Sequence, residues 1–178
     1  QALIDRDGNI VGAEVLARWK HPEEGLLPPG VFIPIFEKNG MIADLDRYIW
    51  RCACEILNRW KEKNDIFLSV NISPKDFFYL DVWKEFQSLI KEFNIDPAKL
   101  RIEITETAMM ADIEGRIETL SQFRSDGFII EMDDFGSGYS SLNLLKDMPV
   151  DVLKIDMAFL KKTKDEDKAA KILQDIIN

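Results

Sequence analysis

Polar residues end several short apolar segments of the sequence that otherwise have the composition of buried strands. They are Glu14, Asn71, Glu103, the pair Asp133–Asp134, and Lys154. A single one of them would most simply be a residue that faces water at the end of a strand. Five successive segments with the same feature favour another explanation, because the buried strands of parallel sheets are nearly continuous runs of Val, Ile and Leu.

Glu103 is the sharpest case. Strand residues alternate between two faces, so Arg101, Glu103 and Thr105 share one face, and Ile102 and Ile104 lie on the other. An ionised carboxylate on the inner face of a barrel is costly unless a cation pairs with it or a metal binds it.

The chemistry that these residue types allow is that of hard cations. Carboxylate and amide oxygens suit Mg²⁺ or Mn²⁺ better than zinc or copper, and the sequence has only one His, His21. Neighbouring side chains point apart, so Asp133 and Asp134 could each serve a different ion. Two cations would clamp a phosphodiester, activate a water molecule and stabilise the leaving oxygen. The residues alone therefore predict metal-assisted phosphodiester hydrolysis.

Alternating strand and helix patterns must position these residues. A hairpin is expected over residues 1–19, with its second strand at Ile10–Trp19 and a loop at Pro28–Gly30. Further strands are expected at Ile66–Ile72, Leu100–Thr105, Phe128–Met132 and Val152–Ile155. Helices are expected from about Pro34 to Asn39, over Ile42–Trp60, around Val82–Phe93 and Ile113–Phe123, at Leu142–Leu145, and from Ala169 onward. This order predicts an α/β fold with a mostly parallel sheet, and in a parallel barrel the C-terminal strand ends converge on one mouth.

Composition sets further bounds. The 178 residues are 46% hydrophobic and 31% charged, which fits one globular domain, and no segment is apolar enough to cross a membrane. The net charge of −9 excludes a broad basic face for duplex nucleic acid, so a phosphate-bearing ligand would need local Arg or Lys and bound cations. Cys52 and Cys54 do not face each other on a helix, and a cytoplasmic location is expected.

The polar residues also carry a family likeness. The chain resembles the EAL domain, the family of cyclic di-GMP phosphodiesterases. Glu14-Val15-Leu16 corresponds to the signature Glu-Ala-Leu, and later blocks match in order. These blocks are Val70-Asn71-Ile72-Ser73, Glu103-Ile104-Thr105-Glu106, Asp133-Asp134-Phe135-Gly136-Ser137-Gly138 and Lys154-Ile155-Asp156. One tripeptide means little, whereas five blocks in register over nearly the whole chain are highly specific.

The resemblance implies a modified TIM (β/α)8 barrel with an antiparallel first strand. It implies hydrolysis of one phosphodiester of cyclic di-GMP to linear pGpG, with Mg²⁺ or Mn²⁺ and two ions in all. The implied ligands of the first ion are Glu14, Asn71, Glu103 and Asp133, and Asp133 and Asp134 would reach the second. The implied catalytic residues are Glu14, Asp133, Asp134 and Lys154, and Lys154 would contact the attacking water or the scissile phosphate.

Further roles follow from the same resemblance. Leu16 and Arg18 are expected to bind the substrate, Arg18 through a phosphate. Glu106 and Asp156 are expected to support the loop that begins at Asp133. Glu131 is a departure from the family pattern, and it could be a further acidic group inside the barrel or a partner for Arg101.

Later Glu-Gly-Val-Glu and Gln-Gly blocks of the family are not in the sequence. Residues 1–178 are therefore expected to be an incomplete EAL domain that lacks the last strands, because such barrels need about 250 residues, and truncation could leave the chain inactive. The alternative function is a non-catalytic cyclic di-GMP receptor, and a pure interaction surface is a third. A homodimer, companion sensor or GGDEF domains and a membrane tether are compatible with the family.

Overall fold

The structure is a computed structural model that describes residues 1–61, 65–110, 112–136 and 148–156. The expected helices at Leu142–Leu145 and from Ala169 lie outside the described residues, as do Ser137 and Gly138 of the Gly-rich block.

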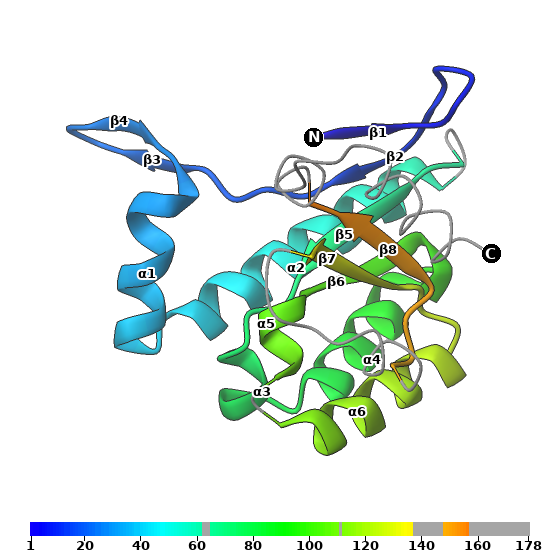
Figure 1. Ribbon diagram of the computed structural model, residues 1–178. Helices are drawn as coiled ribbons and strands as arrows, with labels where there is room; N and C mark the ends of the chain where they lie inside the picture. Colours follow the sequence, from blue (N-terminus) through cyan, green and yellow to red (C-terminus); the bar gives the residue numbers. More distant parts are fainter. Residues whose placement is uncertain (62–64, 111, 137–147, 157–178) are drawn as a thin grey trace, which may run out of the picture.

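A curled six-stranded sheet organises the described chain (Figure 1). Its spatial order is β1 (Ala2–Ile4), β2 (Ile10–Glu14), β5 (Phe67–Asn71), β6 (Leu100–Thr105), β7 (Ile130–Phe135) and β8 (Val152–Ile155). β1 is antiparallel to β2, and every other neighbouring pair is parallel. The expected α/β fold with an antiparallel first strand is therefore confirmed.

Three helices cover one face of this sheet: α2 (Ile42–Trp60), α4 (Val82–Phe93) and α6 (Ile113–Ser125) (Figure 1). Ile102 and Ile104 of β6 face these helices and are fully buried in the same cluster as the helix residues Trp50, Phe86 and Phe123. The aromatic rings in this cluster pack at centroid distances of 4.7 to 6.0 Å, in tilted or edge-to-face arrangements. With the apolar core on the helix side, the other face of the sheet is left for polar residues.

The segment between β2 and α2 differs from expectation. The strand predicted for Ile10–Trp19 ends at Glu14, and a second hairpin follows, β3 (Trp19–His21) and β4 (Gly25–Leu27). The loop predicted at Pro28–Gly30 is wrong after Pro28, because α1 (Pro29–Asn39) begins at Pro29, where a helix needs no N–H donor. α1 also continues through Pro34. The Trp19 ring packs at 5.2 to 5.9 Å from the rings of His21, Phe32 and Phe36.

Three short elements and one shifted strand complete the connections. They are α3 (Asp76–Tyr79), the 3₁₀ turn η1 (Pro97–Lys99) and α5 (Glu106–Met109), none of which has enough residues to show a period in the sequence. The strand expected at Phe128–Met132 is instead β7 at Ile130–Phe135, because Phe128 packs against Phe123 after the end of α6. This shift places Asp133 and Asp134 inside the strand. Within the described ranges, no helix combines the length and apolar character needed to cross a membrane.

Candidate active site

The strand register places the acidic candidates on the sheet face opposite the helices. Asn71 is paired with Glu103, and Thr105 is paired with Asp133. Glu14 is paired with Ser69, which lies two residues before Asn71. Because paired residues of neighbouring strands share a face, Glu14, Asn71, Glu103 and Asp133 all project to the same side. They come from four successive strands.

Glu103 is the most deeply placed of these residues. Its side chain is 1% exposed, and its Oε1 atom accepts no hydrogen bond from any described residue. Burial raises the pKa of Glu103 to about 7, the ammonium group of Lys154 opposes this rise, and the nearby charges of Glu14 and Asp133 add to it. The carboxylates of Glu14, Glu103 and Asp133 therefore lie close enough to repel one another.

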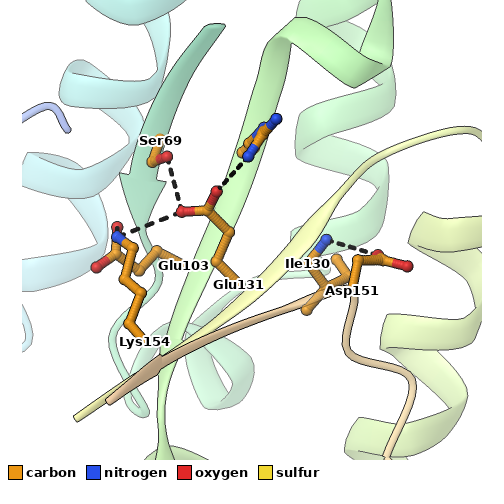
Figure 2. A network of polar contacts seen from close by, with 7 residues as sticks. Ser69, Glu103, Ile130, Glu131, Asp151 and Lys154 are labelled. Atoms are coloured by element: carbon orange, nitrogen blue, oxygen red, sulfur yellow. Dashed lines mark hydrogen bonds and ion pairs between the residues drawn. The ribbon is translucent and has the colours of Figure 1, made fainter. Parts of the chain in front are cut away.

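Lys154 on β8 neutralises part of this charge. Its Nζ atom lies 2.6 Å from Oε2 of Glu103 and 3.3 Å from Oε2 of Glu131 (Figure 2). Burial alone would lower the pKa of Lys154, but the hydrogen bond and charge of Glu103, together with Glu131, raise it above its ordinary value. Lys154 is therefore a charged ammonium group inside the sheet.

Both expectations for Glu131 hold, because it is a buried acidic residue on the same face as Glu103 and also a partner of Arg101. Its Oε1 atom accepts a hydrogen bond from Arg101 at 2.9 Å, and its Oε2 atom accepts one from the Ser69 hydroxyl at 2.9 Å. The Arg101 guanidinium in turn lies 3.3 Å from the centre of the Phe67 ring. A compact ionic network thus lies beside the acidic group, with Glu131 level with Glu103 in the sheet.

The Asp133–Asp134 pair lies at the end of β7, where the strand becomes irregular. Asp134 has a positive φ of 55°, and the pairing with β8 shifts register between Met132 and Phe135. Partial burial, and then the charges of Asp133, Asp156 and Glu14, raise the pKa of Asp134. The carboxylate of Asp134 therefore lies close enough to Asp133, Asp156 and Glu14 to be affected by their charges.

The remaining expected site residues surround this group. Glu106 is 2% exposed, and its Oε2 atom accepts the backbone N–H of Gly136 at 3.0 Å, at the start of the Gly-rich loop. The backbone N–H of Asp156 donates to the carbonyl of Phe135 at 3.2 Å. Arg18 is exposed and donates to the carbonyl of Ala17 at 2.7 Å.

Leu16 lines a cavity of about 270 Å³ beside Asn71, between the sheet, α1 and α2. This cavity also contains an acidic group that sequence reasoning missed. Asp46 of α2 shares a hydrogen bond with buried Asp76, and Glu37 lies nearby. A signal existed, because Asp46 stands four residues from both Ile42 and Trp50 on the buried face of α2.

The donor chemistry fits a hard divalent cation. Glu103 offers a buried carboxylate oxygen without a hydrogen-bond partner among the described residues, and Glu14, Asn71 and Asp133 on the same face each offer a carboxylate or amide oxygen. In the arrangement seen within the described ranges, no three acidic, His or Cys side chains are close enough together to hold an ion. A cation at Glu103 would also have to compete with Lys154.

The fold and this acidic strand-end face define a modified TIM barrel with a candidate hydrolase site at the C-terminal ends of its strands. The family model of the EAL domain matches residues 1–178. The chain belongs to the EAL domain family.

Two relatives from Pseudomonas aeruginosa have described activities. The bifunctional diguanylate cyclase/cyclic di-GMP phosphodiesterase MucR is 33% identical over 177 residues, which cover 98% of this chain and 26% of MucR. The cyclic di-GMP phosphodiesterase PA2567 is 32% identical over 171 residues, which cover 96% of this chain and 29% of the relative. The chain thus spans little more than a quarter of the length of these two proteins.

A solved structure of the MucR phosphodiesterase in complex with cyclic di-GMP superposes on this chain with a TM-score of 0.87. The two are 32% identical, and the match covers 98% of this chain and 72% of that one. The modified barrel expected from the sequence is therefore shown at the level of three-dimensional structure.

Proposed function

We propose that the protein hydrolyses one phosphodiester bond of cyclic di-GMP to give linear pGpG, with two Mg²⁺ or Mn²⁺ ions. The observation that carries this proposal is the acidic face centred on Glu103, with a buried carboxylate oxygen left unpaired among the described residues. It lies at the strand ends of a chain whose relatives MucR and PA2567 are named as cyclic di-GMP phosphodiesterases. Linear pGpG as the product is part of the proposal.

In this proposal, Glu14, Asn71, Glu103 and Asp133 hold one ion, and Asp133 and Asp134 reach the second. Bound divalent cations would supply neutralisation of the phosphate charge and activation of a water molecule. Burial first, and then the negative charges of Glu14 and Asp133, disfavour the ionised form of Glu103 and raise its pKa. The repulsion from these charges favours binding of positive charge at this face.

Lys154 is the proposed catalytic cation of the chain itself. Its ammonium group stays charged between Glu103 and Glu131, so it can donate a hydrogen bond to the attacking water or to a phosphate oxygen. Water oxygen would bond to phosphorus, and the ester bond to the leaving ribose oxygen would break, with a proton transferred to that oxygen. The product keeps the second phosphodiester intact.

Arg18 and Leu16 are proposed to bind the nucleotide, since Arg18 is exposed and Leu16 lines the adjacent cavity. Glu106 is proposed to hold the Gly-rich loop through Gly136, and Asp156 to support the start of the same loop through its backbone contact with Phe135. Companion domains, a homodimer and a cytoplasmic location remain proposals as well.

The test uses the full-length protein with cyclic di-GMP and Mg²⁺, and follows pGpG by liquid chromatography. Glu14→Ala should lower turnover by at least about a hundredfold, because it removes a proposed ligand and its charge. Glu118→Ala, which changes an exposed glutamate on α6, is the matched control and should leave turnover unchanged. Turnover that survives Glu14→Ala would contradict the assigned metal site.

A receptor that binds cyclic di-GMP without cleaving it is the second candidate. The arrangement of the acidic residues favours it. Among the described residues, no three acidic, His or Cys side chains lie close enough together to hold an ion, and Glu103 already forms an ion pair with Lys154. Tight binding of cyclic di-GMP by calorimetry, with no pGpG formed in either Mg²⁺ or Mn²⁺, would establish the receptor in place of the enzyme.

A further inference from the structure

The ionic network beside Glu103 contains a buried carboxylate, Glu131, to which the proposed reaction gives no role. Glu131 is 1% exposed and touches two cations, Arg101 through Oε1 at 2.9 Å and Lys154 through Oε2 at 3.3 Å (Figure 2). Lys154 also lies 2.6 Å from Glu103. Lys154 thus has two buried carboxylates within reach on the same face of the sheet, and only Glu103 is a proposed metal ligand.

We propose that Glu131 is a positioning residue that takes over Lys154 when a divalent cation binds Glu103. This rests on the metal site of the proposed function. A carboxylate that binds a dication can no longer neutralise an ammonium group next to it, because the two cations repel each other. Lys154, whose side chain is 23% exposed, would then be a largely buried charge without a partner unless a second anion received it.

Glu131 is placed to be that second anion. Its Oε2 atom is only a few tenths of an ångström beyond an ordinary charge-assisted hydrogen bond with Lys154. A carboxylate can accept about four hydrogen bonds. Glu131 accepts one from Ser69 and one from Arg101, so it can still accept a hydrogen bond from Lys154. A small movement of the Lys154 side chain therefore exchanges one partner for the other.

Glu131 is supported by close contacts behind it. Arg101 is held against the Phe67 ring at 3.3 Å from its centre. The ring lies so close to Gly12 that a Cβ there would be 2.6 Å from its atoms. Gly12, Phe67 and Arg101 thus form a stack from β2 to β6 that fixes one oxygen of Glu131, while the Ser69 hydroxyl fixes the other.

The consequence is a lysine that stays charged in both states. Without metal, two cations (Arg101 and Lys154) face two carboxyl groups (Glu103 and Glu131), and the charges balance when Glu103 is ionised. With metal at Glu103, Lys154 keeps Glu131 and remains beside the site, where it can serve the water or the phosphate. Glu131 acts through Lys154, and it would not touch the substrate.

A double-mutant cycle on the full-length protein tests this, with Mn²⁺ affinity measured by calorimetry in the absence of nucleotide. Glu131→Gln in the wild-type background should weaken Mn²⁺ binding by at least about tenfold, because displaced Lys154 loses its second partner. In a Lys154→Met background, the same Glu131→Gln change should alter Mn²⁺ affinity by less than about threefold. Lys154→Met alone should strengthen Mn²⁺ binding, because the competing cation is gone.

The controls separate this role from a general effect of charge or of folding. Glu85→Gln, which removes the surface ion pair with Arg47, should not change Mn²⁺ affinity. If Glu131→Gln does not fold, Ser69→Ala removes one hydrogen bond from Glu131 and should show a smaller effect of the same pattern.

An equal loss of Mn²⁺ affinity in both backgrounds would overturn the proposal, since Glu131 would then act directly as a negative charge. No effect of Glu131→Gln, or no Mn²⁺ binding by the wild-type protein, would overturn it too. Because pGpG formation is not the readout, a protein that shows the cycle but hydrolyses no cyclic di-GMP would refute only the proposed function.

Discussion

Replacing Asp46 with Asn should stabilise the protein at neutral and alkaline pH. Asp46 lies on the buried face of α2, shares a hydrogen bond with Asp76 of α3, and is close to Glu37 of α1. Burial first, and then the charge of Asp76, raise the pKa of Asp46 from 3.8 to about 9. The folded protein therefore keeps Asp46 protonated at neutral pH, while the unfolded chain does not.

This difference has a definite sign. Below the ordinary pKa of an aspartate, both states carry the proton and stability is complete. As the pH rises toward the folded pKa of about 9, the unfolded chain gives up its proton first, and stability falls. Over the roughly three pH units up to neutrality, the loss would amount to about 4 kcal/mol. This is an upper limit, because Asp46 lines a cavity of about 270 Å³ in which water can solvate its charged form.

The Asn side chain keeps an N–H donor for Asp76 and has no proton to lose. Asp46→Asn should therefore raise the free energy of unfolding at about pH 8 by about 1 to 4 kcal/mol, and by much less near pH 4. Urea unfolding at several pH values measures this directly. Asp44→Asn is the matched control, since Asp44 is exposed in the first turn of α2 and its loss should cost about 0.3 to 1 kcal/mol at every pH above 5.

Two outcomes would refute the reasoning. If the stability of Asp46→Asn followed the wild-type curve in parallel from acid to alkaline pH, Asp46 would be ionised in the folded protein. If the variant were less stable than wild type at about pH 8, the Asp46–Asp76 contact would depend on a carboxylate at position 46 and not on a neutral donor.

Two further predictions concern the support of the site. Gly12→Ala should lower the free energy of unfolding by about 1 to 3 kcal/mol, because the new Cβ would lie 2.6 Å from the Phe67 ring; adding Phe67→Leu should recover part of the loss in the same urea assay. Glu106→Ala should cost about 1 to 3 kcal/mol, since it leaves the N–H of Gly136 without its acceptor. Glu106→Gln, which retains an oxygen acceptor, should cost clearly less, and equal losses would show that this hydrogen bond is not what matters.

Strong local periodicity made part of the fold predictable from the sequence. The helix Ile42–Trp60 and the strands Leu100–Thr105 and Val152–Ile155 have the bounds that their patterns predict. The hairpin of β3 and β4 was missed because its strands have three residues each, too few to show alternation. The start of α1 was misplaced because a proline pair reads equally well as a loop and as the first turn of a helix.

The candidate site divides in a similar way. Polar residues in otherwise apolar strands identified the face that carries Glu14, Glu103 and Asp133, because alternation within each strand is a local property. The partners across strands were not predictable. Whether Lys154 would pair with Glu103 or with Glu131 depends on strand register and side-chain reach. The Asp46 group was missed for the same reason, since its partners come from other helices.

The acidic face should also limit the stability of the protein when no metal is bound. Burial, and then the negative charges of Asp133, Asp156 and Glu14, raise the pKa of Asp134. These charges therefore disfavour the ionised form of Asp134. Asp134→Asn removes one of these charges, and Asn is among the few residues that tolerate the positive φ of 55° at this position.

The metal-free Asp134→Asn protein should therefore have a higher thermal midpoint than wild type at neutral pH, whereas excess Mg²⁺ should raise the midpoint of wild type more than that of the variant. Asp134→Ala is the informative comparison, because it removes the same charge but fits this backbone poorly and should gain less. A lower midpoint for metal-free Asp134→Asn would mean that Asp134 makes favourable contacts that outweigh its repulsion, and that stability has not been given up for the proposed metal site.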